Sequence, residues 1–313
     1  MPQFISDLIT YKVLGIENQK IAAVVDFFIY DSIKILILIF IVVSVINFIR
    51  TFFEASLIKE KLGKLPFGLG NLTAAMFGAI TPFCSCSSIP LFIGFIESGL
   101  SIGIAFSFLI ASPLVNEVAF VIMGGLFGWK LALMYAASGI ILGTFGGIII
   151  GAMKMDKEII LESNSEKRSE SHMPKKFSGK IRFALRVGYS TLKKLLPYVI
   201  GGVAIGALIH GYVPQEFFTN TIGKYQLLSV PIATIIGVPI YAGCSTIVPL
   251  IFSITANGVP LGTSLAFMMA IAGLSLPEAV ILKRVMSLKL LLTFFGLVAV
   301  GIMIIGYLFN ALA

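Results

Sequence analysis

The stretch TPFCSCSSIPLF, from Thr81 to Phe92, places two cysteines and three serines in five consecutive positions of a very apolar chain. The surrounding residues 67–98 are too long for one simple membrane span, and this polar cluster breaks them midway. A membrane tolerates such a break only where the non-helical backbone is buried in protein or lines a cavity. We therefore expect two half-helices that meet at a non-helical tip.

A second stretch downstream, VPIYAGCSTIVPLI at residues 238–251, repeats the first. Both contain a proline, then Cys-Ser-Ser/Thr-Ile, then Pro-Leu, with a one-residue insertion. An ordered series of matches of this kind indicates an internal duplication. Residues 226–257 are therefore expected to form a second pair of half-helices. The match continues through Gly99 and Gly258, Gly103 and Gly262, Phe108 and Phe267, and residues 111–117 and 272–278.

The composition indicates an integral membrane protein. Of the 313 residues, 58% are hydrophobic and 12% are charged, and the mean hydropathy is +1.01. A soluble domain with a water-facing surface is far less apolar. Apolar stretches of about 20 residues or more predict membrane-spanning helices at 30–50, 101–127, 131–153, 195–213, 260–282 and 288–310.

The distribution of charge sets the predicted orientation. Eleven of the 23 Lys and Arg residues lie between Lys154 and Lys194, where they interleave with five acids. This pattern is typical of a cytoplasmic loop, so the net charge of +8 does not indicate a nucleic-acid partner. The two halves come out in opposite orientation if each broken region enters and returns on one side. If both regions cross fully, the repeats can still be inverted, but the loop Arg50–Lys64 moves outside.

The predicted fold class is an all-α polytopic membrane protein with two inverted-topology repeats, each built as helix, broken re-entrant hairpin, helix, helix. We expect a multi-pass protein of the plasma or inner membrane, with residues 154–194 in the cytoplasm. Such repeats commonly place a substrate site near the midplane, between the broken segments. The predicted parts are an N-terminal amphipathic or interfacial segment 1–29, a first transmembrane repeat 30–153, a basic cytoplasmic linker 154–186 and a second transmembrane repeat 187–313.

All three cysteines lie at the predicted tips, Cys84 and Cys86 in the first and Cys244 in the second. A pseudo-twofold axis in the membrane plane would bring both tips, and so three thiols, to one central point. Thiolates select soft partners. The three cysteines are therefore candidate ligands for a trivalent arsenical, Cu(I) or a similar soft ion. The alternative is that each cysteine packs as a small hydrophobic residue.

Hydroxyl groups accompany the cysteines at both tips. They can satisfy backbone groups that are released where a helix breaks. Alternatively, they bind a hydroxylated substrate or an oxyanion, helped by the free N–H groups of half-helix N-termini. The residues concerned are Ser85, Ser87, Ser88, Ser245 and Thr246.

Two acidic residues, Glu117 and Glu278, occupy matched positions within predicted spanning helices, and Asn116 adds a hydrogen-bond donor beside Glu117. An intramembrane carboxylate is costly and indicates a proton relay or an ion ligand. The alternative is a structural acid that is hydrogen-bonded to a broken hairpin. The sequence contains no nucleotide-binding loop, so we expect an ion gradient or a partner to supply the energy.

The motifs resemble those of a known family. TPFCSCSSIPLF followed by SFLIASPLVNEVAF, and the later GVPIYAGCSTIVPL with LSLPEAVIL, resemble the predicted permeases that include the organoarsenical efflux permeases of bacteria and archaea. The resemblance covers nearly the whole chain beyond about residue 30. It implies an inner-membrane permease. In the characterised branch it implies export of trivalent organoarsenicals such as methylarsenite, with Cys84, Cys86 and Cys244 as candidate ligands.

The residues and the resemblance together predict a secondary-active permease that exports a thiophilic solute, with trivalent arsenicals and organoarsenicals first, coupled to protons or another ion. No cofactor, enzymatic activity or nucleic-acid partner is expected, and the oligomeric state is left open. One alternative is a transmembrane thiol/disulfide module, since a CxC pair closes a strained and labile ring. Another is a transporter of sulfur oxyanions or thiol metabolites.

Overall fold

The computed structural model of the chain describes residues 19–50, 68–81, 85–97, 99–160, 177–212, 228–240, 244–256 and 258–312. Within these ranges the secondary structure is helical, apart from one isolated antiparallel bridge between Ile159 and Met286. The predicted class, an all-α polytopic membrane protein, is confirmed.

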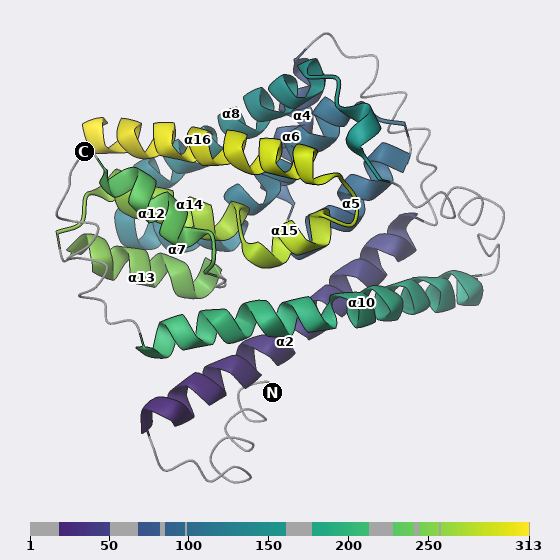
Figure 1. The fold of residues 1–313 in the computed structure, drawn as a ribbon, viewed down its shortest axis with the longest axis horizontal. Helices are drawn as coiled ribbons and strands as arrows, with labels where there is room; N and C mark the ends of the chain where they lie inside the picture. The colour runs from purple at the N-terminus through teal and green to yellow at the C-terminus, as the bar shows by residue number, and fades with distance from the viewer. Residues whose placement is uncertain are drawn as a thin grey trace.

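The helices occur in the same order in the two halves of the chain (Figure 1). The first half contains α2 (Gln19–Arg50), α4 (Leu69–Ile80), α5 (Ser85–Glu97), α6 (Ile102–Leu114), α7 (Glu117–Phe127) and α8 (Trp129–Ala152), and the 3₁₀ helix η2 (Asp156–Glu158) follows. The second half contains α10 (Phe177–Tyr212), α12 (Ser229–Gly237), α13 (Cys244–Ala256), α14 (Leu261–Gly273), α15 (Leu276–Leu282) and α16 (Leu288–Leu312). Helices α13, α14, α15 and α16 each begin 159 residues after α5, α6, α7 and α8.

The turns between the helices repeat at the same spacing. Gly99, after α5, has a φ of 78°, and Gly258, after α13, has a φ of 94°. In the first turn, Leu100 N–H donates to the Phe95 carbonyl, as in a Schellman motif, and the corresponding bond forms after Gly258. Glycine adopts this left-handed backbone without strain. The matching glycines in the sequence therefore mark two equivalent helix ends.

Four segments can cross a membrane by their length and composition. These are α8, α16, the α14–α15 segment Leu261–Leu282, and the pair α6–α7 taken together. They correspond to the predicted spans 131–153, 288–310, 260–282 and 101–127. The remaining predicted spans, 30–50 and 195–213, fall within α2 and almost wholly within α10.

The prediction of one continuous helix over residues 101–127 is wrong. Helix α6 ends at Leu114, and α7 begins at Glu117 after a bend of 43°. Pro113, in the last turn of α6, has no N–H to continue the helical ladder. Helix α14 is interrupted in the same way after Gly273, before α15 begins at Leu276.

The two regions flanking the predicted tips each contain a pair of short helices. Helices α4 and α5 have 12 and 13 residues, and α12 and α13 have 9 and 13. At a rise of about 1.5 Å per residue, none of them can cross a hydrocarbon core of about 30 Å. Each is therefore a half-helix. The residues between them, 82–84 and 241–243, lie outside the described ranges, so re-entry or crossing stays a prediction.

The proposed division of the chain also stays a prediction. Helix α2 begins at Gln19, within the predicted N-terminal segment 1–29. Helix α10 begins at Phe177, within the predicted linker 154–186. Both boundaries therefore lie inside helices that continue into the repeats.

Equivalent helices of the two halves pack against each other in an antiparallel manner. The ring of Phe48, near the end of α2, lies 5.7 Å from that of Phe177, at the start of α10. Helices α2 and α10 run in opposite directions along one side of the molecule, and α8 and α16 lie along the opposite side (Figure 1). Leu142 of α8 packs against Gly301 of α16, and Leu297 packs against Gly146. The α8–α16 contact is therefore antiparallel as well.

The remaining contacts between the halves are reciprocal. Helix α5 of the first half contacts α15 of the second, and α13 of the second half contacts α7 of the first. Helices α6 and α14 contact each other at the centre. Reciprocal contacts of this kind are the property of an interface with twofold symmetry.

Helices α6 and α14 form the core of the molecule. Nearly every residue of both helices is buried. Helix α8 approaches α6 closely through Gly147, where an added Cβ would collide with the Ser107 hydroxyl and the Gly103 carbonyl. Small residues allow this backbone approach in membranes, where lipid provides no hydrophobic drive for helix association.

We expect Gly147→Ala to destabilise the protein. Overpacking costs about 1–3 kcal/mol, which exceeds the gain of up to about 1 kcal/mol from replacing a helical glycine. Gly296→Ala in α16 is the matched control, because no atom lies within 4 Å of its added Cβ. Thermal unfolding in detergent measures both. A Gly147→Ala protein as stable as the Gly296→Ala protein would contradict the close α6–α8 packing.

Candidate functional site

The two helix breaks lie together at the centre of the molecule. Leu114 is the last residue of α6, and Gly273 is the last residue of α14. A Cβ on Gly273 would lie 2.9 Å from Leu114 Cδ2. The breaks after α6 and after α14 therefore meet at the interface between the halves. In membrane proteins, irregular backbone at such a position commonly forms substrate and ion sites.

Side chains satisfy the backbone of the first break. The Asn116 side-chain oxygen accepts hydrogen bonds from Val118 N at 2.9 Å and from Ala119 N at 3.4 Å. It therefore caps α7. The buried Tyr135 hydroxyl of α8 donates to the Leu114 carbonyl at 2.6 Å. Asn116, which the sequence suggested as a donor beside Glu117, thus uses its oxygen to hold the start of α7.

The second break is tied to the first half-helix of its own repeat. Leu276 N–H, at the start of α15, donates to the Val238 carbonyl at 3.2 Å. Val238 directly follows α12, and Cys244 begins α13 six residues later. Pro277 lies in the first turn of α15, where its missing N–H leaves no helical bond unmade. This contact holds the break beside the segment that leads to the second tip.

Both predicted acids lie at these breaks. Glu278, in the first turn of α15, is fully buried, and neither of its carboxyl oxygens has a hydrogen-bond partner among the described residues. The same holds for Glu117 Oε2, at the start of α7, and for the Ser275 hydroxyl just before α15. A buried carboxylate without a partner is very unfavourable. Carboxyl groups in this setting therefore exchange protons or bind cations.

The two acids do not occupy equivalent positions, contrary to the prediction. Glu117 is the first residue of α7, and Glu278 is the third residue of α15. At the spacing of 159 residues, Glu117 corresponds to Leu276, and Asn116 corresponds to Ser275. One repeat has its proline before the break and the other has it after, and this difference shifted the sequence match by two residues.

The helices that carry the cysteines pack on the acidic half-helices of the opposite repeat. Helix α5, which includes Cys86, contacts α15, and α13, which begins with Cys244, contacts α7. The rings of Phe127 in α7 and Phe252 in α13 lie 5.2 Å apart. Each acidic half-helix therefore has a cysteine-bearing helix as its neighbour.

The family model for predicted permeases, ArsP_1, matches residues 20–311. The chain belongs to this permease family. The described apolar helices and the family together establish a membrane transporter with several spans.

Three relatives of the permease agree with this assignment. The UPF0718 protein MJ0584 of Methanocaldococcus jannaschii is 24% identical and aligns over 95% of this chain and 96% of its own. The "Putative two-component membrane permease complex subunit" of Streptococcus mutans is 26% identical, over 76% and 77%. The UPF0718 protein YraQ of Escherichia coli is 21% identical, over 76% and 66%. No solved structure matches the permease significantly.

The structure leaves the predicted thiol site open. Cys84 lies outside the described residues, and so do the side chains of Ser85, Cys86, Ser87, Cys244, Ser245 and Thr246. Ser88, by contrast, is described and fully buried in α5. Among the described residues, no three His, Cys, Asp or Glu side chains gather closely enough to hold a metal ion. Convergence of the three thiols stays a prediction.

Sequence reasoning missed two residues of the site. Tyr135 lies 21 residues from the carbonyl that it binds, and no sequence pattern connects the two. Ser275 could have been found, because the spacing of 159 residues pairs it with Asn116 as the residue that precedes a half-helix. In the permease these residues surround the central breaks.

Proposed function

We propose that the permease is a secondary-active transporter that exports a thiophilic solute, with trivalent organoarsenicals such as methylarsenite as the first candidates. One observation carries this proposal. Two broken helices cross at the interface between the halves, and each acidic half-helix packs on a cysteine-bearing helix of the other half. The proposed site lies between the breaks, in the plasma or inner membrane, with residues 154–194 on the cytoplasmic side.

The proposed mechanism of transport is alternating access by two inverted repeats. The antiparallel pairing of α2 with α10 and of α8 with α16 supports it. A twofold axis across the helices relates the two faces of such a molecule, so rocking one repeat against the other exchanges an inward-open site for an outward-open one.

In this proposal the solute binds through Cys84, Cys86 and Cys244. Arsenic(III) bears hydroxyl groups in water. Each As–S bond forms as an As–O bond breaks, and the thiol proton leaves with the hydroxyl as water. Hydrolysis of the As–S bonds on the far side returns the protons to the sulfurs, so the exchange needs no oxidant or reductant. The proposed role of Ser85, Ser87, Ser245 and Thr246 is to bind the hydroxyls of the incoming solute.

Glu117 and Glu278 are the proposed coupling residues. Glu278 is fully buried without a described partner, so a charge on it is unfavourable in the present conformation. A proton that reaches Glu278 removes this charge, and rocking of the repeats would carry the proton to the other face. Asn116 serves this role indirectly, because it fixes the start of α7 beside Glu117.

Changing Cys84, Cys86 and Cys244 together to Ser is expected to abolish uptake of methylarsenite into everted vesicles. The serine hydroxyl has nearly the same shape as the thiol but forms no stable bond to arsenic(III) in water. The chain contains no other cysteine, so restoring each cysteine singly provides the matched series. Transport by the cysteine-free protein at the wild-type rate would rule out the thiol site, provided that both proteins reach the membrane in equal amounts.

Glu278→Gln is expected to uncouple transport from the proton gradient. The amide keeps the shape of the side chain but cannot carry a proton across. Uptake should fall to the rate seen without a pH gradient, while methylarsenite still protects the thiols from alkylation. Asp156→Asn, at an exposed position in η2, is the control and should respond to the gradient normally. A Glu278→Gln protein that is still driven by the gradient would exclude Glu278 as the coupling group.

A further inference from the structure

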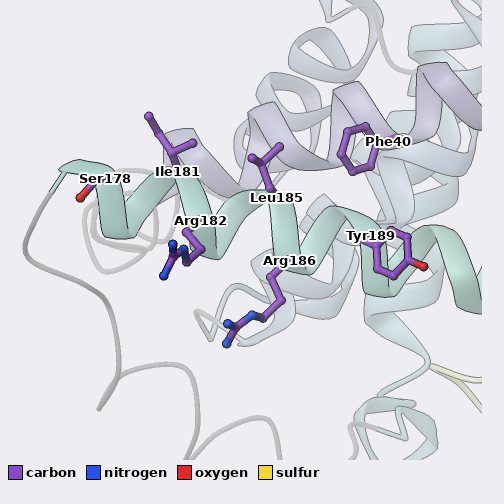
Figure 2. A pocket seen from close by; sticks show the side chains of 7 residues that line it. All are labelled: Phe40, Ser178, Ile181, Arg182, Leu185, Arg186 and Tyr189. Atoms are coloured by element: carbon purple, nitrogen blue, oxygen red, sulfur yellow. The ribbon is translucent and has the colours of Figure 1, made fainter.

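A groove of about 570 Å³ lies along the contact of α2 and α10 (Figure 2). Phe40 of α2 and Ile181, Leu185 and Tyr189 of α10 give it apolar walls, and Arg182 and Arg186 line it with positive charge. Binding pockets for small molecules commonly range from about 300 to 1,000 Å³. The groove is therefore large enough for a polar headgroup and the beginning of an acyl chain.

The two arginines form one cationic surface. They lie four residues apart, and Figure 2 shows both side chains extending from the same side of α10. Both are exposed, and neither forms an ion pair with another described residue. Like charges four residues apart on a helix repel each other. An anion between them would remove this repulsion, and guanidinium groups bind phosphate in a bidentate manner.

An apolar stripe runs beside this cationic surface. Phe177, Ile181, Leu185 and Tyr189 recur at every fourth position of α10 and are 63%, 40%, 45% and 64% exposed. A helix with an exposed apolar face next to Arg and Lys is typical of the membrane interface, where the apolar side enters the acyl region. The chemistry of the groove thus matches a molecule with an anionic head and an apolar tail.

The length of α10 places this groove near the head groups. Its 36 residues extend about 54 Å, against about 30 Å for the hydrocarbon core. The helix therefore projects well beyond the core at one or both ends. Residues 177–189 carry the arginines and directly follow the basic linker. The positive-inside rule puts this end on the cytoplasmic side.

We propose that the α2–α10 groove binds an anionic phospholipid. Arg182 and Arg186 hold the phosphate, and the acyl chain lies along Ile181, Leu185 and Phe40. Since α2 and α10 belong to different halves of the permease, the lipid contacts both halves at once. This site is separate from the central breaks, and the proposal does not depend on the transported solute.

Native mass spectrometry of the full chain in detergent tests the site with added phosphatidylglycerol and phosphatidylcholine. We expect the wild type to retain phosphatidylglycerol preferentially. The Arg182→Gln/Arg186→Gln protein should need roughly tenfold or more lipid for the same occupancy, since each cation near the surface contributes to anionic lipid binding. Arg182→Lys/Arg186→Lys should retain much of the preference because it keeps both charges.

The control removes the same charge elsewhere. Lys130→Gln/Lys283→Gln changes two exposed cations that do not line the groove, and its lipid retention should equal that of the wild type. Equal binding of both lipids by the wild type, or an equal loss in both double variants, would overturn the proposal. Full competition by millimolar glycerol 3-phosphate would also overturn it, because the site would then recognise a soluble phosphate and not a lipid.

Discussion

The fold depends on how the backbone is satisfied where its helices break inside the membrane. No water is available there to bond a free carbonyl or amide, so each break needs partners from the protein. The first break has the Tyr135 hydroxyl on the Leu114 carbonyl and the Asn116 side chain at the start of α7. The second has the bond from Leu276 to Val238. These contacts fix the direction of both half-helices.

The same constraint concentrates polar groups at the centre of an apolar molecule. Because α6 and α14 meet at Leu114 and Gly273, the two breaks share one location. The acids at the starts of α7 and α15 lie beside these breaks, and the cysteine-bearing helices α5 and α13 pack on them from the opposite half. The duplication thus supplies two different half-sites that face each other. Neither half of the chain could form this arrangement alone.

The sequence predicted the class of fold and the two pairs of half-helices, because apolar length and polar interruptions are local properties. It identified Glu117 and Glu278 for the same reason. It missed the break within residues 101–127, since a proline in an otherwise apolar run is compatible with a kinked but continuous helix. It also missed Tyr135, whose partner lies on another helix. The matched positions of the acids failed because the sequence comparison allowed gaps, whereas the helices keep one spacing.

The most direct test of the central claim is disulfide formation between the two breaks. Leu114→Cys and Gly273→Cys, introduced together in the cysteine-free protein, should cross-link rapidly under mild oxidation, because their side-chain positions are in contact. Ile102→Cys with Gly273→Cys is the control, since Ile102 lies at the other end of α6. Fast cross-linking of the first pair alone is the predicted result. Cross-linking no faster than the control would show that the breaks do not meet.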